Sequence, residues 1–404
     1  MRSVKRWIGA ASFAVLLSSP PAWAIKVTTS PDFDLNIQVV LQPRLQMDWD
    51  GVPPLPTSTG TDGPTASGRM NVDFYIKRAR LVARGTAFKY FGFLVTLDTP
   101  NFGARGNYSF IQNNETFIQD LVATATPWAD FNIDFGFILV PLSHGSVSTP
   151  TAQSAIDAPG SILAGRLMNN ASRASREAGL QLRGMLFDRK VHFRAGVYEG
   201  ARSSQGIAAP ANGEPTVNPN GKPMIGAMVR YNIVGVEGLT FPGFPSIYID
   251  GKSRWSVGVG AQYQDKSAVG GCLVGTPSCP DYIALAADTF LDFALPADSE
   301  VIFQLNGYRF DYGAGNARTG NGLAFDLGYR FGKIEPQVNG FWFNSDPRNA
   351  SMLKWAAGVN YFFKGHDAKI SAEFVGVING GYLPSAPVPT PTLHQIVVQG
   401  QLSF

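Results

Sequence analysis

Arginines recur at alternate positions in several stretches of the sequence. Arg78, Arg80 and Arg84 share one parity within residues 70–88, and Arg44 lies in the alternating stretch before them. Alternate residues of an extended strand face the same side, so these guanidinium groups would point together. Arginine suits anions such as phosphate, because its planar fork donates two parallel hydrogen bonds and it keeps its charge. We therefore consider an anion-binding set made of Arg44, Arg78, Arg80, Arg84, Arg166, Arg173, Arg176 and Arg183. Arg194 and Arg230 also fall on the water-facing parity of their own strands.

The same arginines have a plainer interpretation. Carboxylates occupy the matching parity nearby, and they could pair with the arginines to form a neutral polar wall. These carboxylates are Asp48, Asp73, Asp98, Asp120 and Asp134. Anion binding and wall structure therefore remain alternatives at this point.

Catalytic and metal-binding chemistry has less support. The four histidines, His144, His192, His366 and His394, fall in unrelated places, so neither a zinc site nor a histidine-dependent triad is predicted. Residues 143–146 read Ser-His-Gly-Ser, which invites comparison with barrel hydrolases. A nucleophile needs a base that is itself oriented, and no third member is evident. No cofactor is expected, and the chain is not expected to be an enzyme.

Extended strands would position the candidate side chains. Residues 34–49 and 131–140 alternate apolar and polar side chains too regularly for a helix. A change of parity at Lys77-Arg78 predicts a β-bulge. The sixteen expected strands are 34–49, 70–88, 89–98, 116–126, 131–140, 177–186, 190–199, 222–233, 254–264, 282–293, 299–310, 322–331, 334–343, 351–363, 368–378 and 393–404.

The connections alternate between short and long, with residues 234–252 as the one clear exception. This is typical of an all-β, antiparallel transmembrane barrel with short periplasmic turns and long external loops. Residues 393–404 end on Phe404 and carry one mostly apolar parity and one parity of amides and hydroxyls. We expect the barrel assembly machinery to read Phe404 and this strand to pair with the first, which removes both edges.

The amino-terminal segment has the pattern of an export signal. A basic start and a short apolar run precede Ala22-Trp23-Ala24, so cleavage before Ile25 is expected, with residues 1–24 as the signal peptide and 25–404 as the barrel. No later run reaches the roughly 18 apolar residues of a membrane helix. The chain carries 33 basic and 30 acidic residues, and three of the basic ones lie in the signal, so a nucleic-acid partner is not expected.

Cys272 and Cys279 lie in one of the expected external loops. In an exported protein such a pair is expected to be oxidised rather than to bind a metal. Closing so short a loop would stabilise the fold by about 2–3 kcal/mol in the chain-entropy model.

Four short motifs resemble the phosphate-selective porin O/P family of Gram-negative outer membranes. They are residues 74–81 (FYIKRARL), the strand end from Gly136 to Ser143, residues 176–180 (REAGL) and residues 358–363 (GVNYFF). The resemblance implies a sixteen-stranded barrel that forms homotrimers, and a third external loop, here residues 141–175, that constricts the pore. It also implies a lysine-rich feature in a later loop, whereas the only basic residue between positions 200 and 221 is Arg202. A general or mildly anion-preferring channel is therefore expected.

Three function classes follow. The first is an outer-membrane porin that passes small hydrophilic solutes, with an anion or phosphate preference as the finer expectation. The second is a plugged structural or adhesive barrel, and the third is an outer-membrane hydrolase. Lipid, the assembly machinery and further copies of the chain are the expected partners.

Overall fold

The computed structural model describes residues 25–30, 33–49, 70–88, 90–104, 116–168, 175–200, 222–239, 241–266, 280–313, 316–347, 350–378 and 393–404. Apart from one short helix, its regular elements are strands that join into one sheet. Across these residues no helix is long and apolar enough to cross a membrane.

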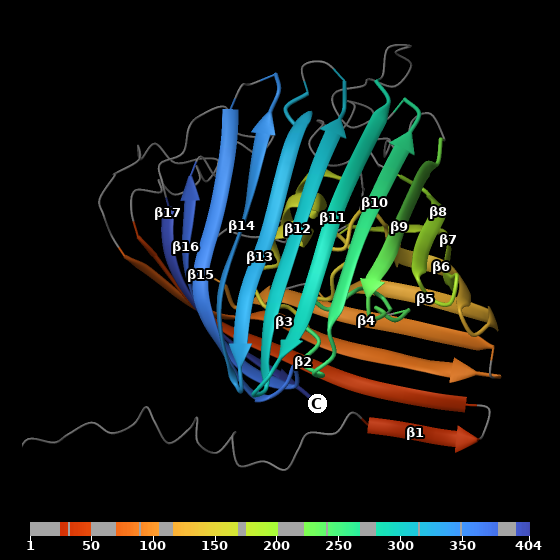
Figure 1. Ribbon diagram of the computed structural model, residues 1–404, viewed down its shortest axis with the longest axis horizontal. Helices are drawn as coiled ribbons and strands as arrows, with labels where there is room; N and C mark the ends of the chain where they lie inside the picture. Colours follow the sequence, from red (N-terminus) through yellow and green to blue (C-terminus); the bar gives the residue numbers. More distant parts are fainter. Residues whose placement is uncertain are drawn as a thin grey trace, which may run out of the picture.

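Sixteen antiparallel strands close into a barrel (Figure 1). Each pairs with its neighbours in chain order, as expected where connections are hairpins. The strands are β2 (Phe33–Trp49), β3 (Asn71–Ala87), β4 (Phe91–Phe102), β5 (Phe117–Trp128), β6 (Phe131–Leu139), β7 (Arg176–Leu186), β8 (Val191–Tyr198), β9 (Met224–Val234), β10 (Arg254–Gln264), β11 (Tyr282–Leu295), β12 (Ser299–Asp311), β13 (Gly320–Phe331), β14 (Ile334–Ser345), β15 (Ala350–Lys364), β16 (Ala368–Ile378) and β17 (Leu393–Ser403). The expected fold class and strand number are confirmed.

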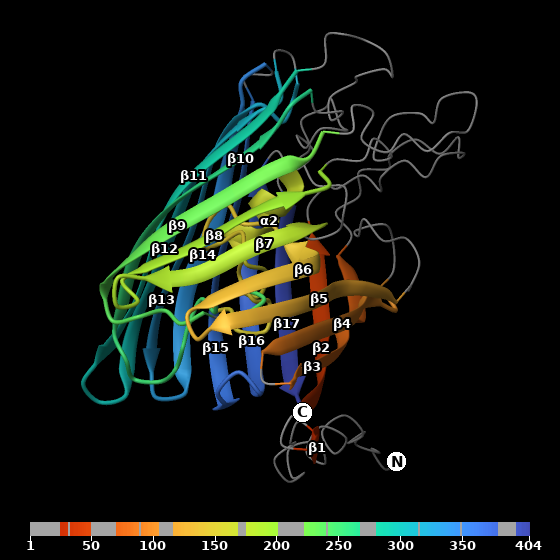
Figure 2. The ribbon, with the colours of Figure 1, turned by 90° about the vertical axis from the view of Figure 1, so that its right-hand side faces the viewer.

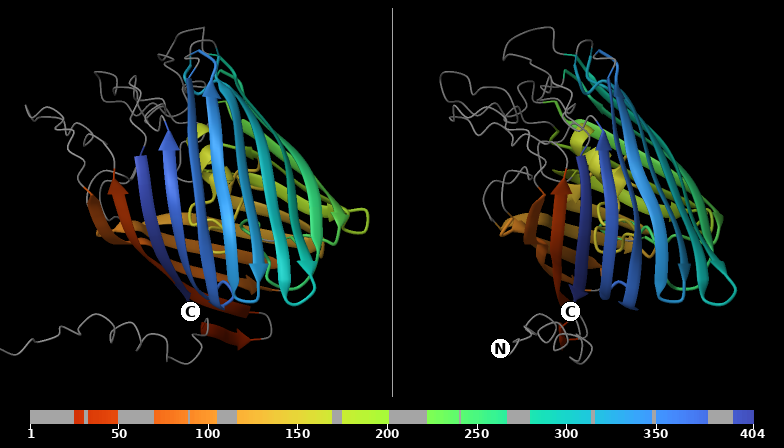
Figure 3. Two further views of the ribbon diagram at one scale, coloured as in Figure 1. Left: turned by 60° about the vertical axis from the view of Figure 1, so that its left-hand side comes forward. Right: turned by 90° about the vertical axis from the view of Figure 1, so that its left-hand side faces the viewer.

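The first and last barrel strands seal the ring. β17 pairs with β2, and the backbone N–H of Phe404 donates to the carbonyl of Val39 at 2.9 Å, with the reverse bond at 2.6 Å. A further strand, β1 (Ile25–Ser30), pairs with the start of β2 and lies below the ring (Figures 1 and 3). β1 was not predicted, because six residues are too few for alternation to stand out.

Side chains alternate between the two faces of the wall. In β13, Leu323 and Leu327 point outward and are exposed, while Ala324 and Asp326 point inward and are buried. The parity change in β3 is the expected bulge: Arg78 pairs with Gln42 and Ile76 pairs with Pro43, so Lys77 is the extra residue. This confirms the prediction and accounts for Pro43, whose missing N–H falls where the ladder is already interrupted.

The connection between β6 and β7 enters the barrel and carries the helix α2 (Pro159–Leu167), which lies inside the ring (Figure 2). Leu163 and Leu167 of α2 are fully buried with Phe341 and Phe343 of β14. Gly322 of β13 permits this packing, because a Cβ there would lie 2.9 Å from Leu163 Cδ2. Residues 141–168 are called the inner loop below.

Residues 235–239 and 241–253, in the connection from β9 to β10, also fold into the barrel, from the end that carries the short turns. Phe241 packs against Leu94, Val122 and Ile138 of one wall. Ile247 packs with Ile302 and Phe362, on β12 and β15 of another wall. In the sequence this segment stands out only as an exception in connection length; the structure shows that it crosses the bore. It is called the crossing segment below.

Candidate pore constriction

Five basic side chains occupy the inner face of one continuous part of the wall. Arg44 comes from β2 and Lys354 from β15, and β3 supplies Lys77, Arg78 and Arg80. Because the bulge adds a residue at Lys77, inward parity shifts there, and Lys77 and Arg78 both reach inward. Lys77 Nζ donates to Asn101 Oδ1 at 3.1 Å, and Arg78 Nη1 donates to Gln42 Oε1 at 2.8 Å. The bulge therefore concentrates positive charge on β3.

One carboxylate of the inner loop faces this basic wall. Asp157 accepts hydrogen bonds from Arg44 Nη2 at 2.9 Å and Nη1 at 3.2 Å, and lies 3.7 Å from Lys354 Nζ. Burial alone would raise the pKa of Asp157, but Arg44, Lys354 and Lys77 outweigh it and hold the pKa well below its usual range. Asp157 is therefore ionised at neutral pH, and its side chain retains 20% exposure.

Three of the predicted arginines are paired with carboxylates inside the wall. Arg80 lies 2.8 Å from Asp98, Arg176 lies 2.9 Å from Asp120, and Arg183 lies 2.6 Å from Asp134. All six of these side chains are at most 8% exposed. The wall-forming interpretation fits these three arginines, since their charge is offset by a contacting carboxylate and little of it reaches water.

The other predicted residues lie in varied surroundings. Arg84 is exposed towards the short-turn end of β3, and Arg194 donates from Nη1 to the carbonyl of Pro242 at 2.8 Å. Arg230 contacts both Asp288 and Glu237. The backbone of Arg166 lies in α2, but its side chain is not described. Arg173, Cys272, Cys279 and residues 1–24 lie outside the described residues, so those expectations stay predictions.

Among the basic groups of the wall that keep access to water, Arg78 and Arg84 were predicted, whereas Lys77 and Lys354 were not. Lys77, Arg78 and Lys354 are partly exposed, whereas Arg44, Arg80, Arg176 and Arg183 are buried. Lys354 could have been found, because it lies on the inward parity of residues 351–363. Asp157 carried no comparable signal, since its role depends on where the inner loop folds.

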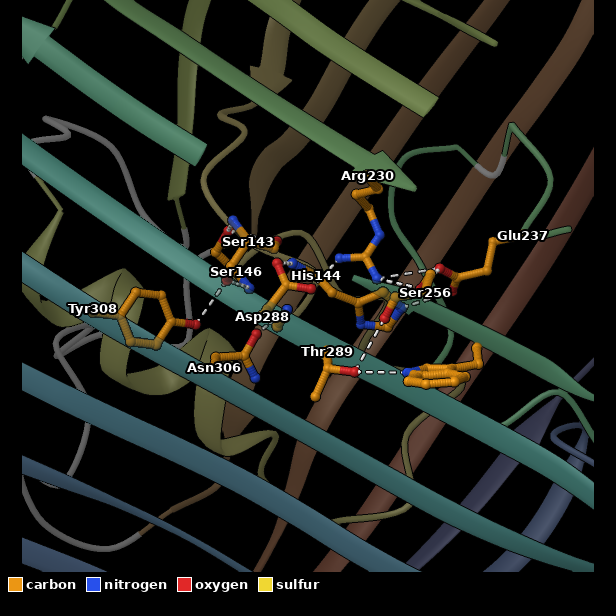
Figure 4. Close-up of polar contacts among 12 residues, drawn as sticks. Ser143, His144, Ser146, Arg230, Glu237, Ser256, Asp288, Thr289, Asn306 and Tyr308 are labelled. Carbon is orange, nitrogen blue, oxygen red and sulfur yellow. Dashed lines mark hydrogen bonds and ion pairs between the residues drawn. The ribbon is translucent and has the colours of Figure 1, made fainter. Parts of the chain in front are cut away.

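A second polar cluster joins the inner loop to the crossing segment (Figure 4). The ring of His144 stacks between Phe244 and Phe290, with centroids 4.8 and 4.3 Å away. His144 Nε2 lies 3.0 Å from Glu237 Oε1, and Ser256 Oγ donates to Glu237 Oε2 at 2.6 Å. Asp288 accepts from the backbone N–H of His144 at 3.1 Å and also contacts Arg230.

Burial fixes the protonation states in this cluster. It lowers the pKa of His144, so the imidazole is neutral at pH 7. Burial opposes ionisation of Glu237, yet His144 and Arg230 hold the pKa of that carboxyl below its usual range. An ionised Glu237 makes the His144 Nε2–H the donor.

The expectation that the histidines fall in unrelated places is wrong for two of them. His144 and His192 both lie against the ring of Phe244, the second at a centroid distance of 5.2 Å. Tertiary folding brings them together through a residue that neither adjoins in sequence. Within the described part of the chain, no group of three His, Cys, Asp or Glu side chains could hold a metal ion.

The serines beside His144 are engaged in local structure. Ser146 Oγ donates to the carbonyl of Ser143 at 2.9 Å, and Ser143 Oγ lies 2.8 Å from Tyr308 OH. The Nε2 of His144 is directed at Glu237 rather than at either hydroxyl. This arrangement lacks the serine–histidine contact that nucleophilic catalysis requires.

Comparisons with known proteins agree with this architecture. A family model described as phosphate-selective porin O and P matches residues 58–223. A comparison with curated proteins gave no match.

Several solved structures share the fold. An anion-selective porin from Comamonas acidovorans has a TM-score of 0.56 and 12% identity, covering 92% of this chain and 100% of its own. OmpF from Salmonella typhi, in complex with daunomycin, has a TM-score of 0.59 and 13% identity, covering 94% and 100%. OprB from Pseudomonas putida, in its high-pH structure, has a TM-score of 0.61 and 8% identity, covering 92% and 94%. At such identities these similarities establish the closed barrel fold and nothing finer.

Proposed function

We propose that this chain is an outer-membrane porin, a passive diffusion channel for small hydrophilic solutes that favours anions at its narrowest part. The barrel fold and the family match over residues 58–223 support the channel. The observation that carries the anion preference is the set of partly exposed basic groups, Lys77, Arg78 and Lys354, opposite the single loop carboxylate Asp157.

Selectivity in such a channel depends on the charges that a passing ion can approach. Paired arginines such as Arg80 and Arg183 contribute little, because each is buried against a carboxylate. Lys77, Arg78 and Lys354 keep part of their surface in water and share one loop carboxylate with Arg44. Three basic groups, Arg44, Lys77 and Lys354, act on Asp157, so the charge immediately around this carboxylate is positive, which would attract anions and repel cations.

The proposal includes the setting in which such a channel works. The barrel would lie in the outer membrane of a Gram-negative cell, after removal of residues 1–24 and recognition of Phe404 by the assembly machinery. The family resemblance supports assembly into homotrimers. The outward rows of apolar side chains, for example Leu323 and Leu327, supply the surface that contacts lipid.

Planar-bilayer recording tests this proposal. Purified protein in detergent should insert in discrete ohmic steps, and a potassium chloride gradient should give a reversal potential that favours chloride. A chloride-to-potassium permeability ratio of about one would contradict the anion preference and leave a general porin. Replacing chloride by phosphate then asks whether the preference extends to that anion.

A second candidate is a plugged structural or adhesive barrel. The crossing segment favours it, since Phe241 and Ile247 contact walls on different sides of the bore. Side chains on the inner faces of β10 to β12, including Ser256, Phe290 and Asn306, are also buried. A plugged barrel would insert into a bilayer without ohmic steps, which separates it from the porin.

A further inference from the structure

The inner loop and the crossing segment meet inside the barrel through backbone hydrogen bonds. Phe244 N–H donates to the carbonyl of Val147 at 2.8 Å, and its carbonyl accepts from Thr149 N–H at 2.7 Å. Ser246 N–H donates to the carbonyl of Ala152 at 2.8 Å. The two segments enter from opposite ends of the barrel and form a short parallel β-pairing there.

Side chains reinforce this pairing around Glu237. The carboxylate contacts His144 of the inner loop, Arg230 of β9 and Ser256 of β10. Tyr248 OH lies 3.3 Å from Glu237 Oε1, within the crossing segment itself. Glu237 is therefore the one described carboxylate that touches the inner loop, the crossing segment and the wall together.

The crossing segment is itself held at its far end. Tyr248 N–H donates to Asp292 Oδ2 at 2.8 Å, and the guanidinium of Arg254 lies 3.8 Å from the ring centroid of Tyr248. His366, in the turn between β15 and β16, lies 2.8 Å from the carbonyl of Ile247 through Nε2. These anchors allow the segment to resist displacement rather than follow the inner loop passively.

The inner loop is hydrogen-bonded to β14 and β16 just before Asp157. Ile156 N–H donates to Glu373 Oε1 at 2.7 Å, and Ser154 Oγ donates to Glu335 Oε1 at 2.6 Å. Ser154 N–H also donates to Ser246 Oγ of the crossing segment at 2.8 Å. Asp157 therefore follows directly after a stretch clamped between the wall and the crossing segment.

We propose that residues 235–253 are a strut that positions the inner loop, with Glu237 as the positioning residue of the joint. On this view the narrowest part of the pore is set by two chain segments, one from each end of the barrel. The inference rests on the proposed channel function and deepens it, because it names what holds Asp157 in place. If residues 235–253 merely filled space, a substitution at Glu237 would not change the effect of Asp157 on the selectivity of the channel.

The first measurement is the current noise of the open channel. Glu237→Gln keeps the size of the side chain but removes the charge held by Arg230 and His144. We expect the open-channel noise to rise by about twofold or more, because the loop gains alternative positions. Glu300→Gln is the matched control, since Glu300 is a buried carboxylate paired at 2.8 Å with Arg330 in the wall and contacts neither inner segment in the described contacts. The control should remain as quiet as wild type.

The second measurement is the coupling between Glu237 and Asp157. The selectivity shift caused by Asp157→Asn should fall to about half or less in the Glu237→Gln background, because residues that act through one another are not additive. Phe244→Leu provides a milder variant with the same expected direction, since it removes the stacking on His144 but keeps an apolar side chain. Heat-modifiable mobility in gels and circular dichroism establish that each variant is folded.

Two outcomes are distinguishable. A wild-type protein without ohmic steps overturns the proposed function, and the strut with it. The strut alone is overturned if the wild type conducts but the Glu237 and Phe244 variants show no added open-channel noise. In that case the selectivity shift caused by Asp157→Asn would also be the same in these backgrounds as in wild type.

Discussion

Neutralising Asp157 should make the channel more anion-selective. Asp157 is the loop carboxylate that faces Arg44, Lys77 and Lys354, and those cations hold it ionised. Asp157→Asn preserves the size of the side chain and one hydrogen-bond acceptor for Arg44. The substitution therefore removes a negative charge from the edge of the solute path without opening a cavity.

The expected size of the effect follows from Coulomb's law. Two unit charges about 5 Å apart in water interact by about 0.8 kcal/mol, and screening in 0.1 M salt leaves about 0.5 kcal/mol. An anion passing Asp157 would gain roughly that amount and a cation would lose it, a difference of about 1 kcal/mol. Since 1.4 kcal/mol corresponds to a factor of ten, the anion-to-cation permeability ratio should rise about fivefold.

Reversal potentials in a potassium chloride gradient measure this ratio directly. Asp346→Asn is the matched control: Asp346 lies just after the end of β14 and pairs with Arg309 of β12 at 2.5 Å, and both side chains are more than a third exposed. The control changes the net charge equally and should leave the ratio unchanged. A ratio in Asp157→Asn that equals wild type, or moves towards cations, would show that Asp157 does not face the solute path.

The remaining predictions concern single residues. Arg78→Gln should lower anion preference more than Arg80→Gln, because Arg78 is partly exposed whereas Arg80 is buried against Asp98; equal reversal potentials for the two variants would contradict this. Burial lowers the pKa of His366 to about 4, below the unfolded value of about 6.5, so the imidazole is neutral in both states above pH 6.5. Stability should therefore fall as the pH drops from about 6.5 to 4, by at most about 3 kcal/mol, and thermal unfolding in detergent should show a flatter pH profile for His366→Asn. Gly322→Val should destabilise the protein by about 1–3 kcal/mol, because its Cβ would meet Leu163 of α2, and an unchanged unfolding midpoint in denaturant would refute that contact.

Local alternation was enough to predict the wall. Each barrel strand has one apolar and one polar face, so its residues carry a period of two that can be read without knowing any partner. The same reasoning located the bulge at Lys77, because a bulge changes the parity within a single strand. The inward arginines and their carboxylates were identified in this way, but their pairing was left open.

The contents of the bore depended on tertiary structure. Asp157 meets Arg44 and Lys354, and His144 meets Glu237 and Phe244, across separations that no local pattern spans. Whether a connection stays outside or folds inside depends on what it can pack against there, as Phe241 and Ile247 do for residues 235–253. The strands and their faces were therefore determined by the sequence alone, since each residue's environment repeats along the chain. The position of the constriction was decided only when distant segments met within the closed ring.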